Sequence, residues 1–377
     1  MQESKLRAVA KLGQSIWLDF IRRSLLTSGG LQEYVDKGVR GVTSNPAIFE
    51  KAITAGSEYD GELQRLAAEG MSAREIYEAL AIADIQRAAD ILRPVFDAEG
   101  KAGALLAPGD DGYVSLEVNP AMAHDAQGTI AEARRLNNAV DRPNVMIKVP
   151  ATSEGLVAIE RLTAEGLNIN VTLMFSLLQY DQVAAAYLRG LEARAEQGES
   201  LSEIASVSSF FVSRIDVKID RLLDAIGTAE AAALRGKIGI VSAKMAYQRF
   251  KATFRGERWV RLANRGAHVQ RVLFGSTSTK DPAYPDTLYV DNLIGAETVN
   301  TLPPDTIEAF LDHGTAAATL ETDVAAALSQ LEALDQVGID LSGATRELLD
   351  EGIEKFATPF DSLLGVIEAK RVAVHAI

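Results

Sequence analysis

The sequence contains no cysteine and only four histidines among its 377 residues. Without cysteine there is no disulfide framework, no thiolate nucleophile and no metal site with thiolate ligands. The histidines, His124, His268, His313 and His375, lack the mutual spacing typical of metal ligands. We therefore expect neither a metal nor another cofactor. The composition fits a reducing compartment.

Positive charge and long apolar runs are also scarce. The chain has 38 Lys and Arg against 52 Asp and Glu, a formal net charge of −14. This balance argues against a nucleic-acid surface, and any site for a phosphorylated metabolite must be a local concentration of positive charge. No apolar run reaches the roughly 18 residues of a membrane span, and the N-terminus lacks the apolar segment of a signal peptide. The sequence predicts a soluble, cytoplasmic protein without nucleic-acid or membrane partners.

Short apolar strands that alternate with helices are abundant. We expect eight strands, at residues 15–20, 39–45, 113–118, 144–152, 167–175, 205–211, 271–276 and 299–302. Alternation of this kind builds parallel sheets, and about eight units favour a closed barrel over an open doubly wound sheet. The first strand is not followed by a Gly-x-Gly-x-x-Gly motif, which also weighs against a dinucleotide-binding open sheet.

The predicted fold class is therefore α/β, with one (β/α)8 TIM barrel domain over residues 1–377. Additional helices are expected at the N-terminus, after strand 2 and at the C-terminus. Residues 305–377 read as mainly C-terminal helices, with turns around Gly338 and Thr358-Pro359. Ser72 and Glu75 have the spacing of a capping box that opens a long helix.

Lys148 stands near the end of the fourth expected strand, Asn144-Val-Met-Ile-Lys-Val-Pro-Ala-Thr152. Lysine is seldom buried without a partner, and a lysine that loses its proton near neutrality can form a Schiff base with a carbonyl. Alternatively, the side chain reaches from the strand end into solvent and does no chemistry. This strand alone leaves both interpretations open.

Strand alternation predicts which side chains share a face. In the lysine strand, Met146 and Lys148 face the barrel interior, whereas Val145, Ile147 and Val149 form the apolar outer face. By the same rule, the inward side chains of the third strand are Ser115 and Glu117. Those of the fifth strand are Asn170 and Thr172, with Ile169, Val171 and Leu173 outside.

Polar residues thus gather at the ends of several strands. Beside Lys148, Glu117, Asn170 and Thr172, the late positions of other strands hold Asp19, Asn45, Ser209 and Ser276. Any one of them could be a satisfied polar group of the core. Several at the same strand ends predict an active site, because catalytic groups of this fold lie there. Carboxylates beside a lysine suit the proton transfers of Schiff-base chemistry.

At these residues the sequence resembles the transaldolase family, in particular its longer bacterial and plant-like subgroup. The matching stretches are Gly41-Val-Thr-Ser-Asn-Pro46, Val114-Ser-Leu-Glu-Val118, Ile147-Lys-Val-Pro-Ala-Thr152, Asn170-Val-Thr-Leu-Met-Phe-Ser176, Ser209-Phe-Phe-Val-Ser-Arg-Ile-Asp216 and Ser276-Thr-Ser-Thr-Lys-Asp-Pro-Ala-Tyr284. The resemblance implies a transferase of the pentose phosphate pathway. Such an enzyme moves a dihydroxyacetone unit from sedoheptulose 7-phosphate to glyceraldehyde 3-phosphate, giving erythrose 4-phosphate and fructose 6-phosphate.

The resemblance also implies roles for the residues. Lys148 would form the Schiff base, and Asp19 would take the proton of the donor hydroxyl and return it to the acceptor. Glu117 and Thr172 would hold the water of imine formation and hydrolysis. The hydroxyls of the dihydroxyacetone unit would be held by Asn45, Asn170 and Ser209.

The phosphate ligands that the resemblance implies are Arg214 and Ser276. Ser278 stands where many short members have arginine, so Lys280 is expected as the second basic ligand, although lysine acts as a point charge rather than a bidentate fork. Phe211 takes the position of a tyrosine in the related fructose 6-phosphate aldolases. Phe274-Gly275 replaces the expected Trp-Ala, a change expected to reshape the phosphate end.

Two alternatives remain beside the transferase. One is an aldolase that releases free dihydroxyacetone, although Phe211 and Glu117, a glutamine in those aldolases, favour transfer. The other is a non-catalytic protein that binds sugar phosphates. The sequence leaves open whether the chain is a monomer or a homodimer, and whether the C-terminal helices cover the barrel mouth or contact another subunit.

Overall fold

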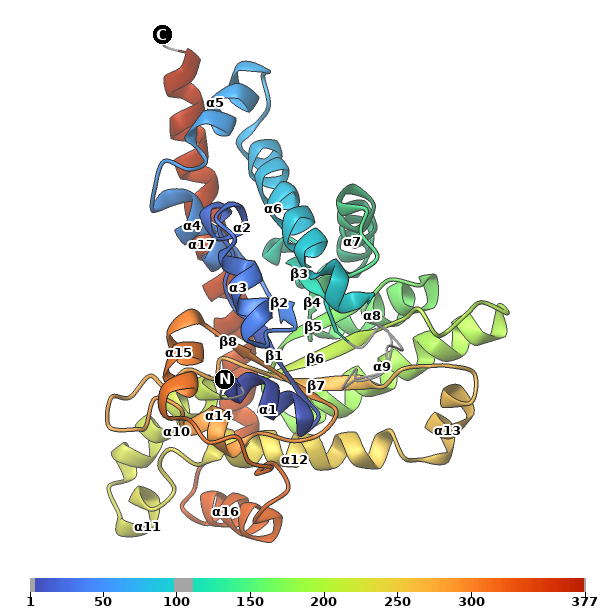
Figure 1. Ribbon diagram of the computed structural model, residues 1–377. Helices are drawn as coiled ribbons and strands as arrows, with labels where there is room; N and C mark the ends of the chain where they lie inside the picture. Colours follow the sequence, from blue (N-terminus) through green and yellow to red (C-terminus); the bar gives the residue numbers. More distant parts are fainter. Residues whose placement is uncertain (1–3, 98–110, 376–377) are drawn as a thin grey trace.

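The computed structural model describes residues 4–97 and 111–375 (Figure 1). In this part of the chain, eight parallel strands close into a barrel in sequence order, which confirms the predicted (β/α)8 fold. The strands are β1 (Gln14–Leu18), β2 (Gly41–Val42), β3 (Val114–Glu117), β4 (Val145–Pro150), β5 (Ile169–Met174), β6 (Ser206–Phe211), β7 (Gln270–Gly275) and β8 (Thr298–Leu302). Each corresponds to an expected strand, and β2 is much shorter than expected.

Helices precede the barrel, cover its outside and extend from it. Up to β4 they are α1 (Lys5–Lys11), α2 (Arg23–Thr27), α3 (Gly30–Lys37), α4 (Pro46–Thr54), α5 (Asp60–Ala68), α6 (Ala73–Phe96), the short 3-10 helix η1 (Pro120–Met122) and α7 (Ala126–Val140). From β4 to β7 they are α8 (Ser153–Glu165), α9 (Leu177–Glu196), α10 (Ser213–Ile226), α11 (Ala229–Ala232), α12 (Ile238–Thr253) and α13 (Glu257–Ala263). The remainder are α14 (Leu288–Asn292), α15 (Pro304–His313), α16 (Val324–Gln336) and α17 (Leu341–His375).

The barrel wall separates two apolar layers. The inner layer is a small cluster that includes Trp17, Met146 and Val207, and the outer layer joins the wall to the helices. Met146 lies inside, and Val145 and Ile147 pack outside, as the strand alternation predicts. At the bottom of the barrel, the guanidinium of Arg271 donates to Ser15 Oγ at 2.6 Å. The interior is thus filled below the mouth, and polar groups at the upper strand ends face open space.

Leu173 belongs to the outer apolar layer, as predicted, but it ends the regular geometry of β5. Its φ is +59°, a left-handed conformation that is uncommon for leucine. The register between β5 and β6 shifts between Val171 and Met174. A Cβ built on Gly352 of α17 would lie 2.9 Å from Leu173 Cδ2. The bulge therefore turns this side chain towards the C-terminal helix.

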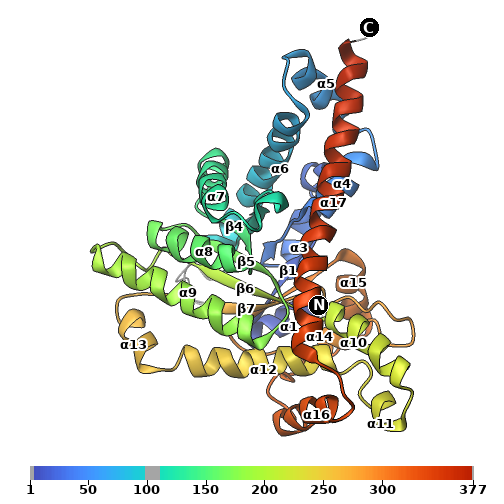
Figure 2. The ribbon, with the colours of Figure 1, turned by 180° about the vertical axis from the view of Figure 1, so that it is seen from behind.

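Helix α17 also corrects a prediction, because it continues through Pro359 where a turn was expected. A proline removes one backbone donor and crowds the preceding turn. Burial compensates: Phe356, Phe360 and Leu363 are all at most 6% exposed. Figures 1 and 2 show α17 running past the barrel mouth and alongside α4 and α5. None of the helices in the described residues is long and apolar enough to span a membrane.

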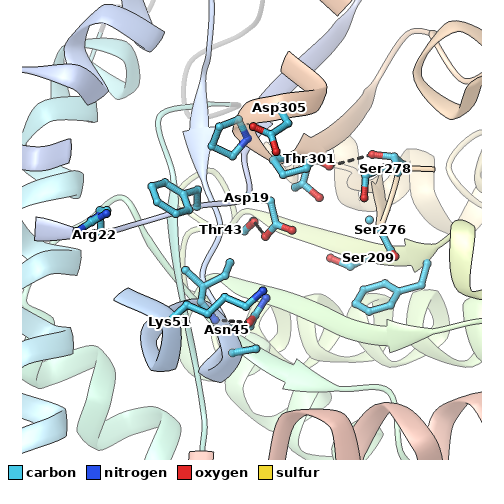
Figure 3. Close-up of a pocket in the computed structure, with 18 of the residues that line it drawn as sticks. Asp19, Arg22, Thr43, Asn45, Lys51, Ser209, Ser276, Ser278, Thr301 and Asp305 are labelled. Carbon is cyan, nitrogen blue, oxygen red and sulfur yellow. Dashed lines mark hydrogen bonds between the residues drawn. The ribbon is translucent and has the colours of Figure 1, made fainter. Parts of the chain in front are cut away.

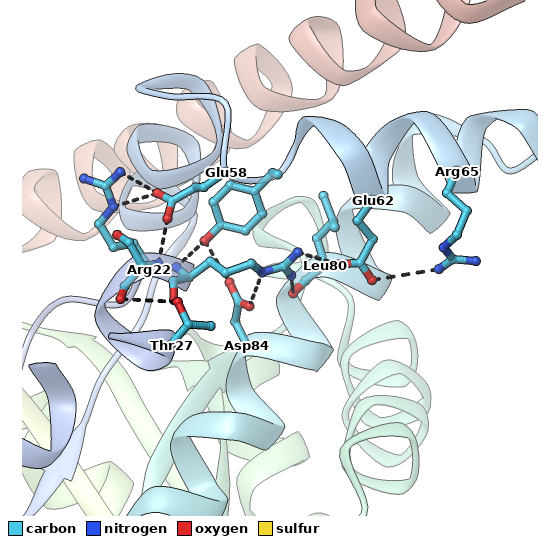
Figure 4. A network of polar contacts seen from close by, with 10 residues as sticks. Arg22, Thr27, Glu58, Glu62, Arg65, Leu80 and Asp84 are labelled. Carbon is cyan, nitrogen blue, oxygen red and sulfur yellow. Dashed lines mark hydrogen bonds and ion pairs between the residues drawn. The ribbon is translucent and has the colours of Figure 1, made fainter. Parts of the chain in front are cut away.

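A buried ionic network ties the segment after β1 to the helices that follow β2 (Figure 4). Arg23 Nε donates to Asp84 Oδ1 at 2.9 Å, and its other nitrogens reach Glu62 and a backbone carbonyl of α6. Tyr59 Oη donates to the second oxygen of Asp84 at 2.7 Å. Burial raises the pKa of Asp84, and the Arg23 charge opposes that rise. The network holds the chain just after Asp19 in one place.

Candidate active site

A cavity of about 920 Å³ opens at the C-terminal ends of the strands. The predicted site residues that line it are Asp19, Asn45, Lys148, Ser209, Phe211, Arg214, Ser276 and Lys280. Figure 3 shows Asp19, Asn45, Ser209 and Ser276 converging on this space from different strand ends. The remaining predicted residues, Glu117, Asn170 and Thr172, lie in the wall beside Lys148: the strand register pairs Glu117 and Asn170 with it. The structure therefore brings the predicted residues together in one region, at the cavity and in the wall beside it.

Lys148 is buried at the centre of this wall rather than extended into solvent. Its Nζ lies 3.2 Å from Glu117 Oε2, and the two side chains are 6% and 5% exposed. Nζ also donates to the backbone carbonyl of Ser44 at 3.0 Å. Burial raises the pKa of Glu117, whereas the charges of Lys148 and Arg214 lower it. The amine and the carboxyl are close enough to exchange a proton.

Asp19 faces the cavity from the residue after β1. Its Oδ1 accepts a hydrogen bond from Thr43 Oγ1 at 2.8 Å (Figure 3). Its backbone amide donates to Leu302 at the end of β8. The carboxylate is therefore oriented from two neighbouring strands while its second oxygen is available to a ligand. Thr43 belongs to the motif around Asn45, but the sequence analysis did not single it out.

A chain of buried amide and hydroxyl groups crosses the interior below the cavity. Ser209 Oγ donates to Asn170 Oδ1 at 2.7 Å, and Asn170 Nδ2 donates to Ser115 Oγ at 3.0 Å. Both ends of the Asn170 amide are thus fixed. Asn45 caps α4, accepting from the amide of Ile48 at 3.0 Å, as its position before a proline predicts. Its amide nitrogen remains available to a hydroxyl.

Thr172 Oγ1 is a buried polar atom near Lys148 that has no hydrogen-bond partner among the described residues. Glu117 Oε2 is also buried, and in this part of the chain its contact is the 3.2 Å ion pair with Lys148 Nζ, without a hydrogen bond of good geometry. Buried polar atoms of this kind are normally satisfied by protein or by water. The two residues sit on β3 and β5, on either side of the lysine strand.

One end of the cavity is strongly cationic. Arg214 lies in the first turn of α10, and Ser276, with φ +54°, follows β7. The hydroxyl oxygens of Ser213 and Ser276 are 2.9 Å apart, which joins the two segments. Burial lowers the pKa of Arg214, and burial together with the Arg214 charge lowers that of Lys280. An anion bound here would relieve both effects and would meet the N-terminus of α10.

Phe211 lines the cavity next to Arg214 of the cationic end. Its ring packs edge-on against Phe175, with centroids 5.4 Å apart, and the Arg214 guanidinium lies 5.0 Å from its centroid. A Cβ built on Gly275 would lie 3.1 Å from two atoms of the Phe211 ring. Glycine in place of the expected alanine therefore gives this ring more room.

Comparison with known proteins identifies the family. The profile of the Transaldolase/Fructose-6-phosphate aldolase family matches residues 16–367. The chain belongs to this family. The match runs from β1 into α17 and so includes every residue of the cavity described above.

Full-length relatives agree with the family match. The chain is 47% identical to a protein named transaldolase 2 from a Nostoc species, over 98% of both chains. It is 46% identical to a transaldolase of Thermobifida fusca over 99% of both chains. A transaldolase of Thiobacillus denitrificans is 46% identical over 95% of this chain.

The sequence analysis did not single out several residues that line this transaldolase-family cavity, among them Lys51 and Phe356. Lys51 lines it from α4, one turn beyond Ala47 on the same helix face, and its charge acts on Lys280. The helical spacing from Asn45 and Ala47 could have indicated it. Phe356 lines the cavity from α17, some 200 residues after the lysine strand. No local motif marks it, because its position depends on how α17 crosses the mouth.

Histidines contribute nothing to this cavity. In the described part of the chain, no group of three or more His, Cys, Asp or Glu side chains is arranged to hold a metal ion. His313, for example, pairs with Asp286 at 2.8 Å on the surface.

Proposed function

We propose that the protein is a transaldolase that moves a dihydroxyacetone unit from sedoheptulose 7-phosphate to glyceraldehyde 3-phosphate. The products are erythrose 4-phosphate and fructose 6-phosphate. The observation that carries this proposal is the buried pair of Lys148 and Glu117, 3.2 Å apart, at the base of a cavity that also holds Asp19. The relatives named transaldolase support it over nearly the whole chain.

The mechanism assigns a defined role to each group. The Lys148 amine attacks the ketose carbonyl, and Glu117 and Thr172 hold the water that leaves. Asp19 takes the proton of the hydroxyl beside the scissile bond, the carbon–carbon bond breaks, and the aldose leaves. The enamine on Lys148 then attacks the acceptor aldehyde, and Asp19 returns the proton to the new hydroxyl. Water held by Glu117 and Thr172 hydrolyses the product imine.

The substrate is held at both ends in this proposal. Asn45, Asn170 and Ser209 hold the hydroxyls of the dihydroxyacetone unit. The phosphate binds at the cationic end, where Arg214 supplies a planar fork and Lys280 a point charge. Lys51 supplies a further positive charge from α4. Such a concentration of cations is required in a protein with a net charge of −14.

The alternatives have less support. Release of free dihydroxyacetone is not favoured, since Phe211 and Glu117 differ from the residues of the aldolases and the full-length relatives are named transaldolases. A non-catalytic sugar-phosphate binder has no need for a buried lysine paired with a buried carboxylate. We also infer a single domain over residues 1–377 and a cytoplasmic location.

Borohydride trapping tests the proposal directly. The protein is incubated with fructose 6-phosphate, reduced, and mapped by peptide mass spectrometry. A three-carbon adduct on Lys148, absent from Lys148→Met, is the expected result. Lys244→Met is the matched control, because Lys244 is a buried lysine, 6% exposed, on α12 outside the cavity. Folded protein with no adduct, or an adduct that persists in Lys148→Met, would contradict the Schiff-base mechanism and favour the binding protein.

A further inference from the structure

The C-terminal helix α17 takes part in the active-site cavity. It packs on α4 and α10 and against the end of β5, and it contributes Phe356 to the cavity lining. Phe356 is only 4% exposed, so its ring is enclosed between the helix and the barrel mouth. In Figure 2, α17 runs the length of the molecule past the strand ends. Of the two roles open to the C-terminal helices, covering the mouth is the one that this geometry supports.

The Phe356 ring lies against both functional cations. Its centroid is 5.7 Å from Lys148 Nζ and 5.6 Å from Arg214 Cζ. Glu117 and the Ser44 carbonyl occupy other sides of the same ammonium, at 3.2 and 3.0 Å. An aromatic face attracts a desolvated cation, whether ammonium, guanidinium or the iminium of a Schiff base. The ring thus completes the surroundings of the reacting nitrogen with an apolar surface.

The position of this ring is set one helical turn earlier, at Gly352. A Cβ there would lie 2.9 Å from Leu173 Cδ2 and 3.6 Å from Arg214 Nη1. Leu173 is the residue with φ +59° at the bulge of β5. A glycine and a strained leucine therefore allow α17 to approach the strand ends closely. Since Gly352 and Phe356 share a helix face, this approach brings the ring over Lys148.

A cover over Lys148 can affect which of two reactions the enzyme-bound intermediate undergoes. After carbon–carbon cleavage, the three-carbon unit remains on the Lys148 nitrogen as an enamine. In transfer, the enamine carbon bonds to the carbonyl carbon of the acceptor, and the new alkoxide takes its proton from Asp19. In release, that carbon takes a proton instead, water adds to the iminium carbon, and the carbon–nitrogen bond breaks. Free dihydroxyacetone and the Lys148 amine result.

We infer that Phe356 is a positioning residue that shields the intermediate on Lys148 from bulk water and thereby favours transfer over release. The inference rests on the proposed transaldolase function. Water for hydrolysis of the product imine is held separately, by Glu117 and Thr172 in the wall. Exclusion of bulk water protects reactive intermediates from side reactions.

Substitution of Phe356 tests this inference. The measured quantity is the ratio of free dihydroxyacetone released from fructose 6-phosphate without acceptor to transfer onto erythrose 4-phosphate. Phe356→Met keeps an apolar side chain without a ring, and we expect the ratio to rise about tenfold. Phe356→Tyr retains the ring and should stay near the wild-type ratio. Phe360→Met is the matched control, since Phe360 lies one turn away and packs on Tyr77 at 5.2 Å.

Gly352→Ala is a second variant, used if Phe356→Met does not fold, as shown by the absence of a cooperative thermal unfolding transition. The added methyl would lie 2.9 Å from Leu173 Cδ2, so either the Leu173 side chain or α17 must shift. We expect this change in packing to raise the ratio with the ring itself intact. An unchanged ratio in these variants, or an equal rise in Phe360→Met, would overturn the inference. Wild-type protein that neither transfers nor forms an adduct would contradict the proposed function itself, which is a different result.

Discussion

Lys148 and Glu117 lie directly opposite each other on adjacent strands, with Nζ 3.2 Å from Oε2. The parallel register of β3 and β4 makes this pairing, and the two side chains point into the barrel together. A buried cation needs such a counter-ion, and a buried carboxylate needs such a cation. Here Glu117 Oε2 faces the Lys148 ammonium directly, so the carboxylate is placed to exchange a proton with that nitrogen.

Removing the carboxylate should stop proton transfer at the imine. We expect Glu117→Ala to lower kcat by about 10²- to 10⁴-fold, the usual contribution of a general acid–base group. Glu132→Ala is the control, because Glu132 is also buried, at 7% exposure, but pairs with Arg74 outside the cavity. Steady-state rates on folded protein, checked by thermal unfolding, measure the effect. A wild-type kcat in Glu117→Ala would exclude this role.

Asp19→Asn should separate imine formation from bond cleavage. An amide cannot take the proton of the donor hydroxyl, so kcat should fall by about 10²- to 10⁴-fold. Borohydride trapping with fructose 6-phosphate should then give an adduct of the intact six-carbon ketose on Lys148. Thr43→Val removes only the 2.8 Å hydrogen bond to Asp19 and should cost about tenfold. A three-carbon adduct formed at the wild-type rate in Asp19→Asn would rule out this assignment.

Lys280 should make phosphate binding depend on pH. Lys280 is exposed by surface area, but the surrounding protein atoms desolvate its ammonium and the Arg214 charge repels it, and both lower its pKa. The ammonium therefore loses its proton at a lower pH than that of an ordinary lysine. The KM for fructose 6-phosphate should therefore rise as the pH increases through the alkaline range. In Lys280→Arg the charge persists and this rise should disappear. Fructose, which lacks the phosphate, is the control substrate; the same pH dependence for fructose would place its cause elsewhere.

Asp84 should be a large contributor to stability. Asp84→Ala leaves the buried guanidinium of Arg23 and the hydroxyl of Tyr59 without their shared acceptor (Figure 4). Breaking a buried ion pair from one side costs about 3–5 kcal/mol. Glu69→Ala is the control, since its pair with Arg65 is more than half exposed and is worth about 0–1 kcal/mol. Denaturant unfolding compares the two, and similar losses would show that the network is not a main anchor.

The strands and their inward residues could be predicted because both depend on short-range patterns. Alternation along β3 and β4 is a property of neighbouring residues, so Glu117 and Lys148 could be assigned to one face without any coordinates. In a closed barrel of parallel strands, the carboxyl ends of all the strands lie together at one mouth. Asn45 as the cap of α4 follows from Asn-Pro alone. These local patterns could not predict the distance between Lys148 and Glu117 or how deeply the two side chains are buried.

Tertiary structure decided the features that break local rules. The expected turn at Pro359 is absent because Phe356, Phe360 and Leu363 bury enough apolar surface to retain the helix. Leu173 faces Gly352 of α17, a distant helix, because of the bulge in β5. The sequence by itself determined the barrel and the polar groups at its mouth. Which distant helix covers that mouth was decided only by packing between segments that no local periodicity connects.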